Sequence, residues 1–296
     1  MRVRGLAVLG IVVLLATGGC TRAEPVTAGG LDEVAAVTRD AALYERLPGT
    51  VRDRGFIRFV TDASYAPMEY FAADGRTIIG FEPDLAAALG NVLGIRVEMV
   101  MGDFATSLDE VNDGTYDGVL SAMTDTGQRR ERADFVNYFN TGTSILVQRG
   151  NPRGIHTLLD LCGNSAAVKK GTYQEKMLLT LRKTCSDRGL TMHSVATNAD
   201  ALVELRTGRV TAALQDFPPA SFVSTDERTS AFFQLASEEQ YEPGLFGIAV
   251  DKGNTELRDC LRDALQRLID SGVYADLLAR WELTASAVPA ATVNGT

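Results

Sequence analysis

Histidine and tryptophan are scarce in this 296-residue chain, which contains two histidines and one tryptophan. Neither His156 nor His193 falls at metal-ligand spacing from a cysteine, and no GxSxG nucleophile motif occurs. Positive charge is also in deficit, because 38 acidic residues outnumber 29 basic ones and the net charge is −9. This composition gives little support to a metal centre or a hydrolase and disfavours a nucleic-acid partner. We expect no metal and no cofactor.

Long apolar runs are missing after Cys20, and none approaches the roughly 20 residues of a membrane span. A transmembrane receptor is therefore disfavoured. Apolar residues still make up 45% of the chain, which is enough for two lobes with ordinary cores.

The N-terminus has the layout of a bacterial export signal. Arg2 and Arg4 precede an apolar run over residues 6–16, and TGGC ends at Cys20. The last four residues resemble a lipobox, although Thr17 stands where leucine is commonest, and this resemblance implies lipidation of Cys20. A retained membrane helix is the weaker alternative, because the apolar run is short. We expect residues 1–20 to be a lipoprotein signal peptide and the protein to be extracytoplasmic, anchored by lipid to a bacterial membrane.

The remaining cysteines have different expected roles. Cys260 lies on an apolar stripe with helical spacing, which predicts a buried thiol. Cys162 and Cys185 flank one strand-helix unit, and in an oxidising compartment we predict a disulfide between them. Metal binding by these cysteines is the alternative.

Strands and helices alternate along the chain, which predicts an α/β fold with mainly parallel sheets. Strands are expected near residues 56–60, 95–99 and 116–123, and helices over 31–47 and 254–281. The predicted organisation is a linker and helical extension over 21–50, lobe 1 over 51–144 plus 241–283, lobe 2 over 145–240, and a disordered tail over 284–296.

Five segments in order resemble family 3 extracellular solute-binding proteins, the amino-acid-binding components of ATP-driven importers. They are TDASYAPMEY, GFEPDLAAALGNVLGI, DGTYDGVLSAMTDTGQRRERADFVNYF, AAVKKGTYQE and TAALQD. The similarity extends over residues 56–283. It implies the type II periplasmic-binding-protein fold, in which two α/β lobes, each a mixed sheet flanked by helices, are joined by two crossover strands and hold the ligand between them.

The resemblance also implies a set of ligand-binding residues. Arg129 and Thr124 correspond to the positions that bind the ligand carboxylate, and Asp216 to the acid that pairs with its ammonium. The other implied ligand-binding residues are Asp62, Tyr65, Glu82, Phe104, Ala122, Lys169, Gly171, Thr172 and Tyr173.

The residue types suit these roles. A guanidinium offers a planar fork of donors that matches a carboxylate, and a helix N-terminus after VKKGT presents backbone N–H groups to an anion. Structural alternatives exist for several positions. Arg129 could belong to a solvated helix face, Phe104 to the core, and Asp62, Asp216 and Glu82 could be helix caps or surface acids.

Some residues depart from the family pattern. Gly127 and Gln128 replace the usual Pro and Glu before the arginine, Tyr173 is bulkier than usual, and Asp125 is an additional acid. The resemblance implies a monomer that captures an amino acid by lobe closure and delivers it to a membrane permease. The alternatives are an enzyme of the same fold, such as a dehydratase, or a sensory lipoprotein.

Overall fold

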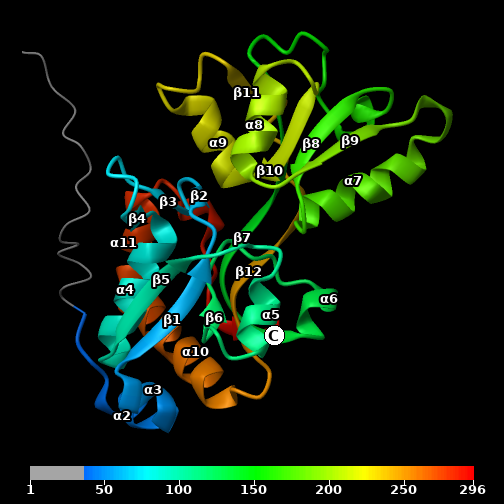
Figure 1. The fold of residues 1–296 in the computed structure, drawn as a ribbon. Helices are drawn as coiled ribbons and strands as arrows, with labels where there is room; N and C mark the ends of the chain where they lie inside the picture. Colours follow the sequence, from blue (N-terminus) through cyan, green and yellow to red (C-terminus); the bar gives the residue numbers. More distant parts are fainter. Residues whose placement is uncertain (1–36) are drawn as a thin grey trace, which may run out of the picture.

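The computed structural model describes residues 37–296 and consists of two halves, one above the other in Figure 1. Cys20 and the predicted signal peptide lie outside the described residues. No helix in the described part of the chain is long and apolar enough to cross a membrane. The two halves are connected by two long strands, as the resemblance implied (Figure 1).

The lower half contains three parallel strands that pair in the order β5, β1, β6: β5 (Arg96–Met101), β1 (Phe56–Thr61) and β6 (Gly118–Val119). The apolar stretch FEPDLAAALGNVL forms α4 (Phe81–Leu93), whose inner side chains are buried against the sheet. The helix ends at Gly94, which takes the left-handed conformation (φ 65°) that glycine adopts without steric cost. The short helix α5 (Ser107–Asn112) packs with a separate apolar cluster that includes Val60 and Val119.

The upper half repeats this arrangement with parallel strands in the order β10, β8, β9: β10 (Ala212–Asp216), β8 (Ser165–Lys169) and β9 (Thr191–Val195). Alternate residues of β8 enter different clusters, since Ala166 and Val168 belong to one and Ala167 to another. Both faces of the strand are therefore covered, which explains its uninterrupted apolar sequence. The covering helices are α7 (Tyr173–Thr184), α8 (Asn198–Arg206) and α9 (Phe217–Thr225).

Two long antiparallel strands, β7 (Ala133–Gln148) and β12 (Tyr241–Asp251), join the halves. β12 pairs with β6 below, β7 pairs with β10 above, and the short β11 (Phe233–Leu235) also pairs with β7. A separate small sheet contains β2 (Ser64–Tyr65), β3 (Glu69–Phe71) and β4 (Ile78–Ile79). The carboxyl ends of β1, β6, β8 and β10 consequently meet at the junction between the halves, where open α/β sheets bind ligands.

Several predicted boundaries were wrong. The helix expected over 254–281 is two helices, α10 (Thr255–Asp270) and α11 (Val273–Arg280), because Gly272 takes φ 86° between them. The strand expected over 116–123 is only the two-residue β6, because the chain turns away before Ala122, whose φ is 46°.

The N-terminal extension also differs from the prediction where it is described. The helix expected over 31–47 is observed as α2 (Ala41–Arg46), and residues 31–36 lie outside the described residues. Asp40 caps α2 by accepting hydrogen bonds from the backbone N–H groups of Ala42 and Leu43. A further helix, α3 (Gly49–Arg54), follows Pro48 and was not predicted.

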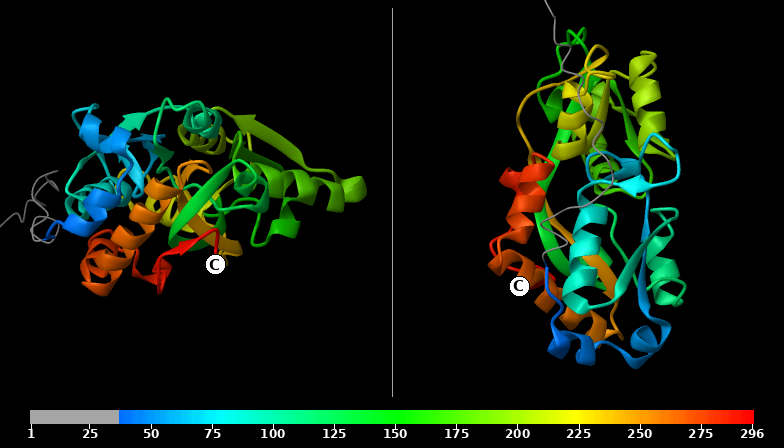
Figure 2. Two further views of the ribbon diagram at one scale, coloured as in Figure 1. Left: turned by 90° about the horizontal axis from the view of Figure 1, so that it is seen from below. Right: turned by 90° about the vertical axis from the view of Figure 1, so that its left-hand side faces the viewer.

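The C-terminal tail was predicted to be disordered, and this was wrong. It forms a short 3-10 helix, η3 (Thr284–Ser286), and a two-residue strand, β13 (Thr292–Val293), that pairs with β7. The side chain of Asn294 bonds Asp134, and the backbone N–H of Gly295 donates to Asn137. Small polar residues are ordered here because β7 offers them hydrogen-bond partners. The tail, red in Figures 1 and 2, lies against the lower half.

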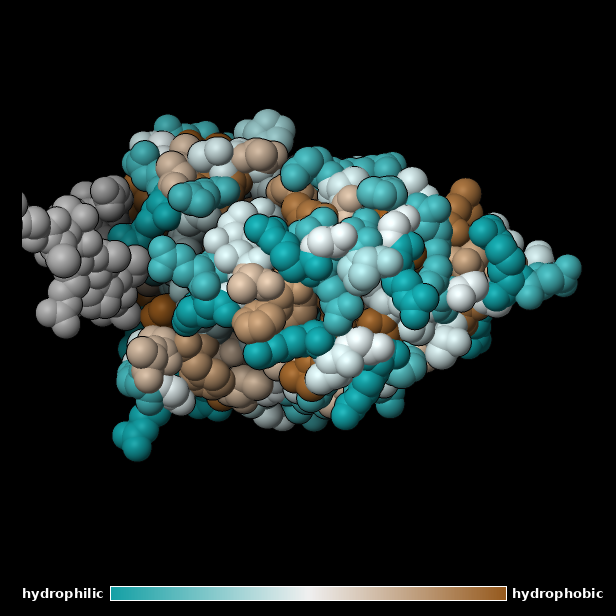
Figure 3. Space-filling model, turned by 90° about the horizontal axis from the view of Figure 1, so that it is seen from above, coloured by the Kyte–Doolittle hydropathy of each residue, from teal (hydrophilic) through white to brown (hydrophobic). Residues whose placement is uncertain are grey.

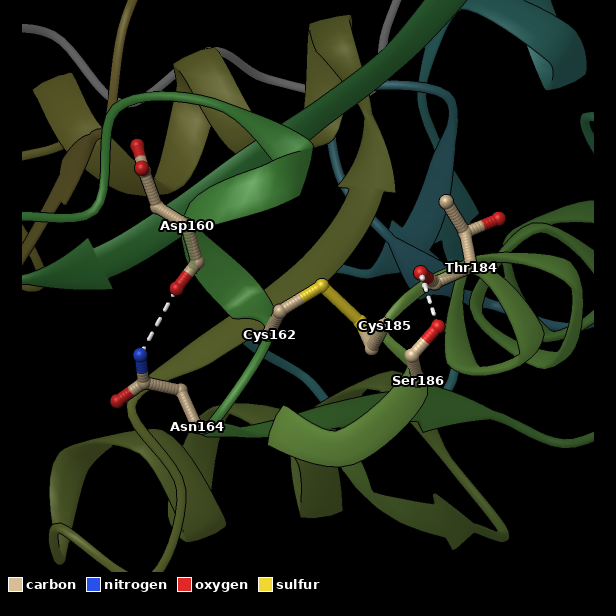
Figure 4. Close-up of a disulfide and its surroundings, with 6 residues drawn as sticks. All are labelled: Asp160, Cys162, Asn164, Thr184, Cys185 and Ser186. Carbon is tan, nitrogen blue, oxygen red and sulfur yellow. Dashed lines mark hydrogen bonds between the residues drawn. A yellow bond between two sulfur atoms is a disulfide. The ribbon is translucent and has the colours of Figure 1, made fainter.

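The predicted disulfide between Cys162 and Cys185 is present (Figure 4). It joins the end of the 3-10 helix η1 (Leu158–Leu161) to the end of α7, so it ties two surface segments of the upper half together. Cys260 is a buried free thiol on α10, as its apolar stripe predicted.

On the face seen from above, apolar side chains are interspersed with polar ones (Figure 3).

Removing the disulfide should destabilise the upper half. The two cysteines are 23 positions apart, and closing a loop of that size stabilises by about 3 kcal/mol through the entropy of the unfolded chain. We expect the double variant C162A/C185A to unfold at a lower urea concentration than the wild type. Its free energy of unfolding should be lower by about 3 kcal/mol. Wild-type protein in reducing buffer should behave like the variant, and equal stability of oxidised and reduced protein would contradict the prediction.

Candidate ligand-binding site

A cavity lies between the halves, at the carboxyl ends of the parallel strands. Its empty volume is about 340 Å³, including its opening to solvent. The residues lining it come from both halves: Asp62, Tyr65, Glu69, Phe104, Ser121, Ala122, Thr124, Arg129, Lys169, Thr172, Tyr173, Gln174, Asn198 and Asp216. Ten of the twelve predicted ligand-binding residues are among them.

Arg129 is held at the edge of the lower half by α6 (Gly127–Arg130). Thr126 caps this short helix, and the guanidinium donates from Nη1 to the carbonyl of Thr124 (2.8 Å) and from Nη2 to the carbonyl of Gly171 (3.1 Å) across the cleft. The central carbon of this guanidinium, Cζ, lies 5.3 Å from the centre of the Phe104 ring. Arg129 therefore faces the cavity and does not belong to a solvated helix face.

Asp216 ends β10 in the upper half and is buried. Its carboxylate accepts hydrogen bonds from Tyr65 Oη (2.9 Å) and Gln174 Nε2 (2.8 Å). It stands at the N-cap position of α9, but its side chain makes no cap hydrogen bond. The carboxylate is thus turned toward the cavity, and the helix-cap alternative does not describe it.

The two charges influence each other through the cavity. Burial raises the pKa of Asp216 to about 7, although the hydrogen bonds from Tyr65 and Gln174 and the charge of Arg129 oppose this rise. Enclosure likewise lowers the pKa of Arg129 to about 10, against the favourable charges of Asp216 and Asp125. Both ionised groups would be stabilised by a partner of opposite charge placed between them.

Lys169 and Asp62 form an ion pair across the cleft. Lys169 ends β8 and is 5% exposed, and Asp62 follows β1 and is 7% exposed, so the pair is buried. The Lys169 ammonium also lies 4.8 Å from the centre of the Phe104 ring. Phe104 is part of an apolar cluster and also forms part of the cavity wall.

Glu82 was predicted to contact the ligand, and the structure corrects this. Its side chain is completely buried behind the site, where it accepts hydrogen bonds from the backbone N–H of Ala122 (2.7 Å) and from the Tyr138 hydroxyl. Since Ala122 has the unfavourable φ of 46°, Glu82 holds a strained turn in place beneath the cavity.

Gly171 was also predicted to bind the ligand but does not line this cavity. Its N–H donates to Glu175 and its carbonyl accepts from Arg129. Its neighbour Thr172 does line the cavity and caps α7 through the N–H of Glu175. The Tyr173 hydroxyl donates to Glu242, so the bulky side chain bridges to β12. The additional acid Asp125 pairs with Arg130 and Asn137 and lies outside the cavity lining.

Four lining residues were not predicted: Glu69, Ser121, Gln174 and Asn198. Ser121 donates to Glu69 and accepts from the N–H of Asp62. Burial and the neighbouring Glu82 raise the pKa of Glu69 well above its usual value. Glu69, Ser121 and Gln174 lie within the quoted segments and Asn198 lies outside them. Polar residues next to turns carry no pattern that distinguishes a cavity wall from the surface.

Comparisons with known proteins agree with this geometry. The chain is 29% identical to the arginine-binding protein ArgT of Corynebacterium glutamicum over 255 residues, covering 84% of this chain and 81% of that protein. It is 27% identical to the L-cystine-binding protein TcyJ of Escherichia coli over 239 residues, covering 80% and 86%. The fold is similar to an ancestral arginine-binding protein bound to arginine, with a TM-score of 0.71, 30% identity and coverage of 77% and 98%.

The bacterial extracellular solute-binding proteins, family 3, match residues 57–284, which include both halves and every residue of the cavity. The chain belongs to this family.

Proposed function

We propose that this protein captures a free amino acid between its two halves and delivers it to the permease of an ABC importer. The observation that carries the proposal is the pair Arg129 and Asp216, which face one small cavity from opposite halves. An amino-acid zwitterion carries the complementary charges on two groups bonded to the same carbon. The named relatives, which bind arginine and cystine, support an amino-acid ligand.

The geometry suggests how binding would favour closure. The ligand carboxylate would lie on Arg129 and the Thr124 hydroxyl of the lower half, and its ammonium on Asp216 of the upper half. A ligand that contacts both halves stabilises the closed arrangement by the contacts that the open one lacks. The closed shape then signals to the permease that ligand is bound.

The organisation of the chain fits this role. We propose lobes at 51–144 plus 241–283 and at 145–240, so that the boundaries fall within β7 and at the start of β12. We also propose that Cys20 carries the lipid anchor and that the protein acts as a monomer.

The variant Arg129→Ala should lose binding of the amino acid that the wild type takes. A hydrogen bond to a charged group contributes about 1.5–3 kcal/mol, so we expect affinity to fall by about 10- to 100-fold in calorimetry. Arg132→Ala is the matched control, because Arg132 lies three residues away and pairs with the exposed Asp109. Equal affinity of Arg129→Ala and wild type would refute the assignment.

Binding should also depend on pH through Asp216. Its pKa is about 7 in the cavity, so below pH 7 the carboxyl is protonated and offers no charge to the ligand ammonium. We expect constant affinity between pH 7 and 8 and a loss approaching tenfold per pH unit below pH 7, with release of protons on ligation.

Calorimetry at several pH values tests this expectation. Asp216→Asn should bind weakly at every pH and lose the dependence around pH 7. A wild-type profile that is flat between pH 5 and 8, together with undiminished binding by Asp216→Asn, would show that Asp216 does not carry the ammonium.

A further inference from the structure

The cavity contains a second pair of opposite charges that the amino-acid backbone of a ligand does not need. Arg129 and Asp216 account for the carboxylate and the ammonium. Lys169 and Asp62 remain, and they are bonded to each other. Among the described residues, the only other acid or base in the cavity lining is Glu69, which is 1% exposed and accepts a hydrogen bond from Ser121.

These contacts decide the charge that a ligand side chain can bring. A cationic side chain would place a second positive charge beside Lys169, with only the carboxylate of Asp62 to balance both. An anionic side chain would place a second negative charge beside Asp62, with only the ammonium of Lys169 to balance both. A buried charge without a counter-charge is strongly unfavourable, so both kinds of ligand are penalised.

Glu69 does not change this balance. Its carboxyl lies beside Glu82, also fully buried, and two carboxyl groups so placed do not both ionise readily. The pKa of Glu69 is raised well above its usual value, first by burial and then by Glu82. Because its pKa is raised, the Glu69 carboxyl offers a cation less compensating charge than an ordinary carboxylate would.

The Lys169–Asp62 ion pair also determines which neutral side chain fits. An ammonium has three donors and a carboxylate has two acceptor oxygens, and the mutual bond uses one of each. Lys169 can therefore donate to a ligand oxygen while Asp62 accepts from a ligand N–H. A carboxamide or ureido group presents one oxygen and adjacent N–H donors, so it complements the pair without separating it.

We infer that the ligand is a neutral amino acid with a carboxamide-like side chain, read by the Lys169–Asp62 pair, and that the site discriminates against cationic amino acids. This inference rests on the proposed function and differs from what the arginine-binding relatives would suggest. It makes Lys169 the residue that determines specificity, because it neutralises the acid that would otherwise attract a guanidinium.

The test is calorimetry of the wild-type protein with a panel of free amino acids. Glutamine, asparagine and citrulline represent the neutral class, arginine and lysine the cationic class, glutamate the anionic class, and norleucine an apolar side chain of similar size. At least one neutral polar member should bind tenfold or more tighter than every other class. Binding of arginine, lysine, glutamate or norleucine at equal strength overturns the inference and leaves the proposed function intact. No binding by any amino acid overturns both.

The variant Lys169→Met tests the role of the pair directly. This variant should bind the neutral ligand tenfold or more weakly than the wild type does. Its affinity for arginine should rise by a similar factor, since Asp62 is then free to accept a cation. Lys170→Met is the matched control, because Lys170 is adjacent and exposed. A folded Lys169→Met protein without a gain for arginine contradicts the inference. Circular dichroism establishes folding, and if the variant does not fold, the wild-type panel decides alone.

Discussion

A carboxylate buried in one half and a guanidinium enclosed in the other are the constraint on which this molecule depends. Neither Asp216 nor Arg129 has a full counter-ion among its own hydrogen-bond partners, which are hydroxyl, amide and carbonyl groups. Burying charge without an ionic partner is costly, and the raised pKa of Asp216 reflects that cost. A protein keeps such groups where a ligand supplies the missing charges.

The fold places these charges by simple means. Parallel strands bring their carboxyl ends to one edge of each sheet, and the two sheets meet at that edge through β7 and β12. Short turns that leave these strands are then enough to bring the lining residues to the cavity. One of these turns is strained at Ala122 and is held by the buried carboxyl of Glu82. Core residues therefore determine the site geometry without touching the cavity.

Sequence patterns identified the fold and much of the cavity lining for different reasons. Alternating apolar strands and helices predicted an α/β fold because burial imposes those periods. The roles predicted for Arg129 and Asp216 came from the resemblance, since composition alone favoured a surface position for Arg129. Glu82 was misassigned because a motif fixes sequence position but not whether a side chain points to the cavity or behind it. The ordered tail was missed because its partners, Asp134 and Asn137, lie about 160 residues away in sequence.

Closure in this protein has two sources that act together. Some contacts between the halves belong to the protein itself, including Tyr65 with Asp216, Lys169 with Asp62 and Arg129 with the carbonyl of Gly171. They favour the closed arrangement whatever the ligand, so a ligand shifts the equilibrium only by the contacts that it adds. A side chain that separates Lys169 from Asp62 would remove one of the protein's own closing contacts while making its own. Specificity and closure are therefore coupled through the same ion pair, and a ligand of the wrong charge is opposed both in binding and in holding the halves together.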